Sequence, residues 1–520
     1  MSDYSDDDKK VLNYFFTNID KPVFASKNFN PEVWALMQAR YSRSTAGLRQ
    51  SFLKLLKEDT DNFEKLKDEI TKTEGGLEAQ HATEKAIQFM EKWVLGYGHS
   101  SVAEGAVIGL ALEGVSILAT KVIEDNRLCS FIEKSTRYVS FNESSFYIDE
   151  TLKNSEFSQE IQELISLLFK TYEELHEPVL KHIKSVAPRD EKTSVPAWER
   201  ACAARRFDAI RYLLPTCTKT SLGWTVNARQ LAHGISKLMS HPLKEMNEIG
   251  ESIKQEATKV IPSLVRYADK KDFLVNTDAE MEPKAKTIEI ENSNAEPVTL
   301  VQGPDNEDAI IASILYRYKQ QPFNNILKKV KSMSAQEKED VYDSYLKHMS
   351  EFDNPQRELE HEQFIFDIII DYGAFRDLQR HRICTQTNQL FTTNLGYDIP
   401  KDITNAGVED RYKEAMGKAK IIYEKVAEKY PLHAQYVLPL GYKKRYLMTI
   451  NLRNLHHFIK LRTIPLAHES YRFIAYKVYE ELKKNYPLLS KYIVCNYSEE
   501  ELGRLKSEEK TEKMETVGPL

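Results

Sequence analysis

The chain has 520 residues, of which 41% are hydrophobic and 29% charged, and this length suits about two to four compact domains. The net charge of -6 disfavours a general nucleic-acid binder, which is usually basic. Apolar stretches are interrupted before they reach the roughly 18 residues of a membrane span, and residues 1–10 lack the apolar core of a signal peptide. We therefore expect a cytoplasmic protein with no nucleic-acid or membrane partner. The five cysteines form no CxxC pair, and no metal site is expected.

The first half of the chain is predicted to be mainly helical. Helical spacing of apolar residues occurs over 31–95, 100–124 and 158–186. A Gly96-Tyr97-Gly98 break precedes the second of these stretches, and Ser100 or Ser101 could cap it. Residues 131–147 are rich in aromatic and β-branched side chains and read partly as strand. A charged, proline-containing loop is expected at 187–199.

The second half begins after a polar segment. Residues 276–306 are rich in Glu, Asn, Pro and Asp and are interpreted as a linker, with a short strand at 297–301. Helical patterning resumes at Ala309. The charged segment 506–520 is expected to be a disordered tail.

An internal repeat organises the chain. The first copy reads Leu214, Pro215, Thr225, Asn227, Arg229, Leu231 and His233. The second copy reads Leu438, Pro439, Thr449, Asn451, Arg453, Leu455 and His457, with identical spacing. We infer two diverged copies of one domain, with a former homodimer interface now inside one chain.

A basic cluster, Arg380-His381-Arg382, follows an apolar run in the second half. Such a cluster offers several donors to an anion such as phosphate. Taken alone, it is more often a solvated basic helix end, which suits the helix dipole. RNA binding through this cluster is disfavoured by the acidic net charge.

These motifs together resemble the flavin-dependent thymidylate synthase family. The resemblance rests on Arg380-His381-Arg382, on Ser135-Thr136-Arg137-Tyr138-Val139, and on Asn-x-Arg-x-Leu-x-His in both halves. It implies an α+β fold in which two tandem domains, each a mixed sheet flanked by helices, form an intramolecular pseudo-dimer. The expected parts are a first domain at 1–275, the linker at 276–306, a second domain at 307–505 and the tail at 506–520.

The family's motif residues are lost in complementary fashion. In the first half, Asp125-Asn126-Arg127 stands at the basic cluster, and Leu238 replaces an arginine that activates the uracil in the family. In the second half, Leu390 replaces the serine, and Gln435 replaces the phosphate-binding arginine. Asp377 stands near an expected substrate-contacting glutamine. The resemblance therefore implies one composite site built from both halves and one degraded site.

The resemblance also implies roles for individual residues. Catalysis is expected of Arg462, which would stabilise negative charge on the uracil ring, and of His99, near the folate and flavin rings. The implied substrate-binding residues are Ser135, Thr136, Arg137, Arg211, Arg380 and Arg462. The implied cofactor-binding residues are Ser101, Glu133, Asn227, Arg229, His233, Arg380, His381, Arg382, Asn451, Arg453 and His457. Asn227 and Asn451 equally fit helix caps, and His233 and His457 equally fit core histidines.

The function implied by the resemblance is methylation of dUMP to dTMP. FAD is the implied cofactor, with methylenetetrahydrofolate and NADPH as cosubstrates, and two chains would make the equivalent of the family's tetramer. Asp377 and Leu390 leave open a relative that acts on another pyrimidine nucleotide or transfers a hydroxymethyl group. A non-catalytic flavin- or nucleotide-binding homologue is a further alternative, which the retained arginines disfavour.

Overall fold

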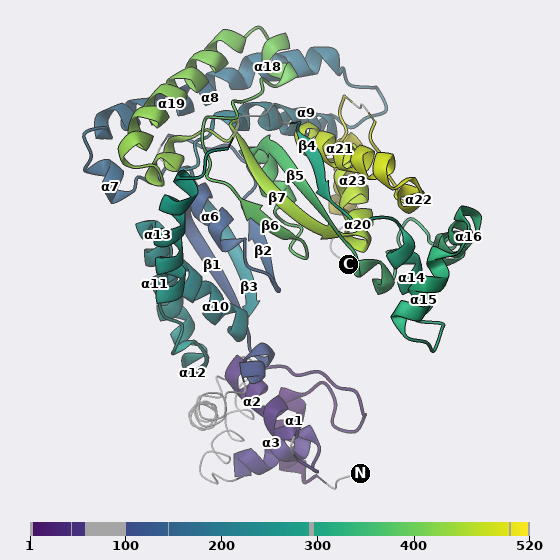
Figure 1. The fold of residues 1–520 in the computed structure, drawn as a ribbon. Helices are drawn as coiled ribbons and strands as arrows, with labels where there is room; N and C mark the ends of the chain where they lie inside the picture. The colour runs from purple at the N-terminus through teal and green to yellow at the C-terminus, as the bar shows by residue number, and fades with distance from the viewer. Residues whose placement is uncertain are drawn as a thin grey trace. The chain divides into compact units, whose positions relative to one another are not determined.

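The computed structural model describes residues 4–42, 44–57, 100–143, 145–290, 296–498 and 501–517. It divides into two compact units (Figure 1). The first unit comprises Met1–Glu113, Asn126–Glu133 and Ser221–Glu289; the second comprises Gly114–Asp125, Lys134–Thr220 and Ile290–Leu520. Each unit is made of several separate stretches of the chain. The predicted domains instead follow the two copies of the sequence repeat, and their boundaries stay a prediction.

The first unit joins a small helical cluster to a three-stranded sheet. Its helices are α1 (Asp6–Phe15), α2 (Pro31–Tyr41), α3 (Leu48–Lys57), α10 (Ala228–Met239), α11 (Lys244–Thr258), α12 (Pro262–Val265) and α13 (Asp272–Lys286), with the 3-10 turn η2 (Ser100–Gly105). Its strands are β1 (Val107–Ser116), β2 (Cys129–Glu133) and β3 (Lys219–Asn227), in the order β1-β3-β2. Edge-to-face contacts among Phe15, Phe16 and Phe52 fill the core of α1 to α3.

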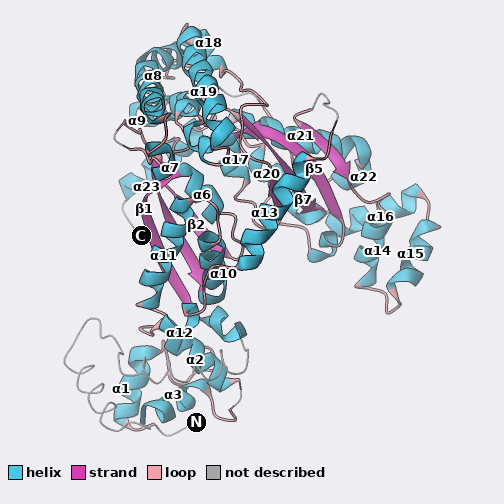
Figure 2. Cartoon of the chain, turned by 60° about the vertical axis from the view of Figure 1, so that its left-hand side comes forward, coloured by secondary structure: helices cyan, strands magenta, loops and turns pink. Residues whose placement is uncertain are grey.

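The second unit is built on a four-stranded sheet with helices packed against it (Figure 2). Its strands are β4 (Val298–Gln302), β5 (Gln363–Asp371), β6 (Thr385–Asn388) and β7 (Lys443–Asn451), in the order β4-β5-β7-β6. All three pairings are antiparallel. Alternate residues of β5, from Phe364 to Ile370, are buried, because one face of an antiparallel sheet covers the core.

Many helices complete the second unit. They are α6 (Ile117–Ile123), α7 (Glu150–Lys153), α8 (Ser158–Val186), α9 (Val195–Ile210), α14 (Asp308–Tyr316), α15 (Phe323–Lys331), α16 (Ala335–Leu346), α17 (Tyr372–Leu378), α18 (Lys401–Asn405), α19 (Glu409–Lys429), α20 (Leu452–Arg462), α21 (Glu469–Asn485), α22 (Pro487–Ser490) and α23 (Leu505–Val517). The 3-10 turns are η3 (Arg211–Leu213), η4 (Arg357–Glu360) and η5 (His433–Val437). This combination of helices and sheets confirms the expected α+β class.

Several predicted elements are confirmed. Helix α8 has the expected bounds, β4 lies within a residue of the strand expected at 297–301, and helical structure resumes at Asp308. The loop expected at 187–199 ends early, because Ser194 caps α9 and Pro196 fits its first turn. Of the helical stretch expected at 31–95, α2 and α3 are helical, and residues 58–99 lie outside the described residues.

Two expectations were wrong. Residues 107–116 form strand β1 rather than part of a helix over 100–124, and the helix α6 starts only after Ser116 caps it. Glycines at 109 and 114, the latter with φ of 73°, disfavour a helix there. The segment expected to be a disordered tail forms α23 as far as Val517, because its acidic side chains pair with partners on α9, as with Glu508 and Arg200.

The internal repeat is visible as a repeated order of elements. Strands β1, β2 and β3 correspond to β5, β6 and β7, and the strand orders β1-β3-β2 and β5-β7-β6 match. In both copies an asparagine ends the last strand and caps the next helix: Asn227 accepts from the N–H of Gln230, and Asn451 from that of Asn454. The sequence repeat is therefore a structural repeat.

The two copies of the Leu-Pro segment pair with each other inside the second unit. The N–H of Thr216 donates to the carbonyl of Leu438, and the N–H of Leu440 donates to the carbonyl of Leu214, both at 2.9 Å. The two bonds join equivalent positions of the two copies, one in each direction. This is the two-fold pattern of an interface between identical subunits. The pairing makes the chain an intramolecular pseudo-dimer.

Candidate functional site

The expected site residues fall into both units. Ser101, Glu133, Asn227, Arg229 and His233 belong to the first unit, and His99 lies outside the described residues. The other expected residues belong to the second unit: Ser135, Thr136, Arg137, Arg211, Arg380, His381, Arg382, Asn451, Arg453, His457 and Arg462. The second unit therefore contains every residue expected to bind the nucleotide.

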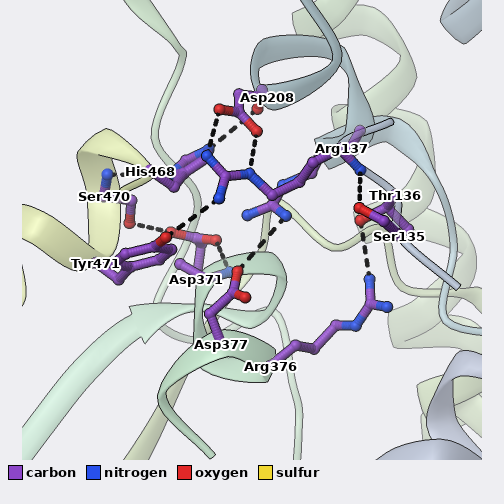
Figure 3. A network of polar contacts seen from close by, with 12 residues as sticks. Ser135, Thr136, Arg137, Asp208, Asp371, Arg376, Asp377, His468, Ser470 and Tyr471 are labelled. Carbon is purple, nitrogen blue, oxygen red and sulfur yellow. Dashed lines mark hydrogen bonds and ion pairs between the residues drawn. The ribbon is translucent and has the colours of Figure 1, made fainter. Parts of the chain in front are cut away.

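The loop that follows β2 carries the Ser-Thr-Arg motif. The backbone N–H of Arg137 donates to Ser135 Oγ at 3.1 Å, and this closes a tight turn. Thr136 is buried, and its hydroxyl accepts from Arg376 Nη1 at 3.2 Å (Figure 3). The motif is thus tied to α17 in the other repeat, which fixes where Ser135 and Arg137 lie.

Arg137 is held by the carboxylate of Asp208 on α9. Its Nε and Nη2 donate to the two carboxylate oxygens at 2.6 and 2.7 Å, and its Nη1 donates to the hydroxyl of Tyr471 at 3.1 Å (Figure 3). Burial would raise the pKa of Asp208, but Arg137, His468 and Arg211 lower it below the ordinary value. Each guanidinium nitrogen of Arg137 therefore has a protein partner.

Arg211 is the most deeply buried of the four arginines that are expected to bind the substrate, with 2% of its surface exposed. Its Nη1 lies 3.8 Å from a carboxylate oxygen of Asp377, beyond hydrogen-bond distance. Its Nε and Nη2 are buried and have no hydrogen-bond partner among the described residues. A buried guanidinium with unused donors is costly, and an anionic ligand would satisfy it.

Asp377 contacts arginines of both repeats: its carboxylate lies 3.8 Å from Arg211, and its backbone carbonyl accepts from Arg462. Its burial raises its pKa, but Arg211, Arg137, Arg380 and Arg462 together lower the pKa well below the ordinary value. Two of these arginines come from the first repeat and two from the second. Asp377 is therefore an ionised carboxylate in a strongly positive environment.

Arg462 is fixed by groups of the basic-cluster turn. Its Nε donates to His381 Nε2 at 2.8 Å, and its Nη2 donates to the backbone carbonyl of Asp377 at 2.6 Å. Its guanidinium also lies 5.4 Å from the centre of the Tyr471 ring. Burial, together with Arg462, His457 and Arg382, lowers the pKa of His381 well below its usual range, so this histidine is neutral and accepts the bond.

The three residues of the basic cluster, Arg380, His381 and Arg382, differ in solvent exposure. Arg380 is exposed, and its guanidinium makes no hydrogen bond to a described residue, whereas Arg382 is partly buried. The His381 ring packs 4.9 Å from Phe458 and 5.8 Å from His457. This donor-rich and aromatic surface suits an anionic, planar group, which is the chemistry of a flavin nucleotide.

Other expected cofactor residues have structural partners. Arg453 donates to the carbonyl of Pro355 at 2.7 Å and to Glu360 at 2.8 Å, and Asn451 caps α20. In the first unit, Asn227 caps α10, and Arg229 pairs with Glu104 at 2.5 Å.

Three further residues expected to bind the cofactor lie in the first unit. Ser101 and His233 are exposed, and Glu133 is half-buried at the end of β2. None of these positions tests cofactor binding, so the expected roles stay predictions.

Sequence reasoning missed four residues of the arginine network: Asp208, His468, Tyr471 and Arg504. Asp208 lies one helical turn before Arg211, and this spacing could have been noticed. His468 Nε2 lies 3.2 Å from the carbonyl of Asp208, and burial with the charge of Arg211 lowers its pKa to about 4.

No cluster of three or more His, Cys, Asp or Glu side chains is arranged to hold a metal ion within the described ranges. Among the helices that the structure describes, none combines the length and apolar character of a membrane span.

The structure is thus that of a tandem α+β protein in which arginines of both repeats lie close to Asp377 in the second unit. The model of the family described as thymidylate synthase complementing protein matches residues 32–263 and 298–488, one segment in each repeat. The chain belongs to this family, as a tandem fusion of two diverged copies.

Relatives fall into two groups. A protein named UPF0159 protein from Chlamydia muridarum is 35% identical over 97% of this chain and 98% of its own length. A UPF0159 protein from Thermoplasma acidophilum is 27% identical over 82% of this chain and 92% of its own length. A flavin-dependent thymidylate synthase from Sulfurisphaera tokodaii is 35% identical over 26% of this chain and 57% of its own length. The two UPF0159 proteins are similar to this chain over most of its length, and the thymidylate synthase over about a quarter of it.

Proposed function

We propose that this protein methylates dUMP to dTMP at the composite site, with FAD, methylenetetrahydrofolate and NADPH. The observation that carries the proposal is the buried guanidinium of Arg211, whose Nε and Nη2 have no partner among the described residues and whose Nη1 lies 3.8 Å from Asp377. Arg462 of the other repeat donates to the backbone carbonyl of the same aspartate. Family membership and the named flavin-dependent relatives support it. Random decay of an inactive protein would not retain one complete set of arginines across two repeats.

The nucleotide phosphate would bind where Arg211 has unused buried donors. Ser135 adds a hydroxyl whose oxygen accepts from the N–H of Arg137 and whose proton can point to the phosphate. Arg137 itself would position this loop through Asp208 rather than bind the phosphate with a free guanidinium edge.

Arg462 would act on the base. Negative charge develops on a uracil ring when its carbon accepts a one-carbon unit, and a fixed guanidinium stabilises that charge. His381 and the Asp377 carbonyl hold Nε and Nη2 of Arg462, and the Tyr471 ring lies beside its guanidinium, so the charge is fixed in place. Bound FAD would supply the hydride chemistry. Arg380, Arg382 and His381 are the residues that would hold it.

A second candidate is methylation of another pyrimidine nucleotide. Asp377 is ionised and only accepts hydrogen bonds, whereas a glutamine both donates and accepts. Such a carboxylate favours a base edge that presents an amino group, as cytosine does.

A turnover assay tests both candidates. Purified protein with FAD, NADPH and methylenetetrahydrofolate would receive either dUMP or dCMP, and the methylated nucleotide would be measured. We expect product from dUMP that Arg462→Met abolishes and that Lys460→Met, a charge loss on the same helix, leaves unchanged. Product only from dCMP would favour the second candidate. No product from either nucleotide, with flavin bound and reduced, would contradict both.

A homodimer equivalent to the family's tetramer and a cytoplasmic location belong to the same proposal. The predicted absence of a nucleic-acid partner rests on the net charge of -6.

A further inference from the structure

The C-terminal segment 501–517 lies beyond the family match, which ends at residue 488. It is attached to α9 by three side chains. Glu508 accepts from Arg200 Nε at 2.9 Å, Glu501 accepts from Arg205 Nη1 at 2.6 Å, and Glu512 accepts from Ser194. Since α9 also carries Asp208, this attachment brings the segment to the arginine network.

Arg504 is the residue that this segment adds to the network. Only 6% of its surface is exposed, and its Nη2 lies 3.6 Å from a carboxylate oxygen of Asp208. Its guanidinium lies 4.8 Å from the centre of the Tyr138 ring. Its Nη1 is buried and has no hydrogen-bond partner among the described residues.

The backbone before Arg504 fits closely against the protein. A side-chain carbon at Gly503 would collide with the carbonyl oxygen of Pro465, so only glycine fits there without a shift. The position of Arg504 is thus fixed by Gly503 on one side and by the Glu508–Arg200 pair on the other.

Arg504 and Arg211 share an environment. Arg504 Nη2 lies 3.6 Å from a carboxylate oxygen of Asp208, and Asp208 stands in the last turn of α9, which Arg211 follows as the C-cap residue. Both arginines are more than nine-tenths buried and keep guanidinium nitrogens without acceptors: Nη1 of Arg504, and Nε and Nη2 of Arg211. Asp208 accepts two bonds from Arg137 and lies 3.6 Å from Arg504 Nη2, beyond hydrogen-bond distance.

The balance of charge at this place also favours an anionic ligand. Three arginines (Arg137, Arg504 and Arg211) pair here with two aspartates, Asp208 and Asp377. A phosphate monoester carries about two negative charges and three acceptor oxygens near neutral pH. It would supply both the missing charge and the missing acceptors.

We propose that Arg504 is a phosphate-binding residue of the composite site, where it and Arg211 hold the phosphate monoester of the nucleotide. The identity of the nucleotide rests on the proposed function, whereas the anion site rests on the buried donors alone.

The test compares full-length wild type with Arg504→Met, Arg504→Lys and Gly503→Ala. Binding of dUMP, deoxyuridine and inorganic phosphate is measured by titration calorimetry, with thermal unfolding in phosphate-free buffer as the check on folding. Lys506→Met is the matched control, because Lys506 is an exposed cation two residues further on.

We expect Arg504→Met to weaken dUMP and phosphate about 10- to 100-fold, as the loss of charged hydrogen bonds predicts, without changing deoxyuridine binding. Arg504→Lys should recover part of the loss. Gly503→Ala should weaken both anions although it removes no charge, and Lys506→Met should behave as wild type.

The outcomes separate the two proposals. Phosphate binding that depends on Arg504, without dUMP binding, would retain the anion site and remove the proposed nucleotide. Phosphate and dUMP affinities unchanged in Arg504→Met and Gly503→Ala, or a wild type that binds neither anion, would overturn the role of Arg504.

Discussion

Arg137 and Asp208 form a two-point ion pair, with Nε and Nη2 at 2.6 and 2.7 Å from the two carboxylate oxygens. Their side chains are 13% and 19% exposed, so the pair is largely shielded from water. The arginine comes from the loop after β2 and the aspartate from α9. Since Tyr471 accepts from the remaining nitrogen, each guanidinium nitrogen of Arg137 has a protein partner, and the ion pair ties the loop to α9.

This pair should contribute measurably to stability. We expect Arg137→Met and Asp208→Asn each to lower the free energy of unfolding by about 2 to 4 kcal/mol, because each change leaves a buried charge without its partner. The double variant should lose less than the sum of the two. Urea unfolding measures all three. Lys425→Met, which breaks the exposed pair with Glu160, should cost about 0.5 kcal/mol or less, and strictly additive losses at the buried pair would contradict its coupling.

Asp377 should act as an internal counter-ion of the arginine network. Asp377→Asn removes the carboxylate that four arginines face, so the variant should unfold at lower temperature in phosphate-free buffer of low ionic strength. Added inorganic phosphate should restore more stability to this variant than to wild type. Asp410→Asn, at an exposed position on α19, is the control. Equal responses to phosphate in wild type and Asp377→Asn would be incompatible with this role.

Much of the fold could be predicted from repeated spacing and apolar periodicity. Helix α8 and strand β4 lie where the pattern placed them, and the fixed offset between the Leu-Pro segments is seen as paired backbones at Thr216 and Leu438. Strand β1 was missed because its apolar residues also fit a helical spacing, and the two glycines that disfavour a helix were given too little weight beside that spacing.

The site could be predicted only as a set of motif residues. The sequence could not show that Asp208, which lies on α9, would form an ion pair with Arg137 in the loop after β2. It also could not show that Arg504 lies beside Asp208. The charged segment that carries Arg504 is held by tertiary contacts with α9, which a sequence pattern does not reveal.

Lys444 predicts a pH dependence of stability. It lies on β7 with 7% of its surface exposed and with Nζ 4.1 Å from the centre of the Phe375 ring. Burial lowers its pKa from 10.5 to about 7, although Asp125 opposes the shift. Between these values the folded state binds fewer protons than the unfolded state, so stability should rise with pH from about 7 to 10.5 and lose this dependence below 7.

The measurement is the free energy of unfolding of wild type and Lys444→Met at pH 7, 8 and 9. We expect Lys444→Met to be more stable than wild type at pH 7. The difference in free energy of unfolding should shrink by up to about 1.4 kcal/mol for each unit by which the pH rises. Lys443→Met, which removes the positive charge at the preceding position of β7, is the matched control. A difference between Lys444→Met and wild type that stays constant with pH would contradict the lowered pKa of Lys444.

The two capping asparagines separate a structural from a cofactor role. Asn451→Ala should cost about 1 kcal/mol of stability, and Asn451→Ser, which can still cap α20, should cost much less. Asn227 should behave in the same way at α10. If flavin content falls in the serine variant while its stability is kept, Asn451 binds cofactor in addition to capping.

The most direct test of a single composite site is the stoichiometry of dUMP binding to the full chain by titration calorimetry. We expect one dUMP per chain, with affinity lost at least about tenfold in both Arg211→Met from the first repeat and Arg462→Met from the second, and kept in Lys460→Met. Two dUMP per chain, or full affinity in either arginine variant, would contradict one site shared between the repeats.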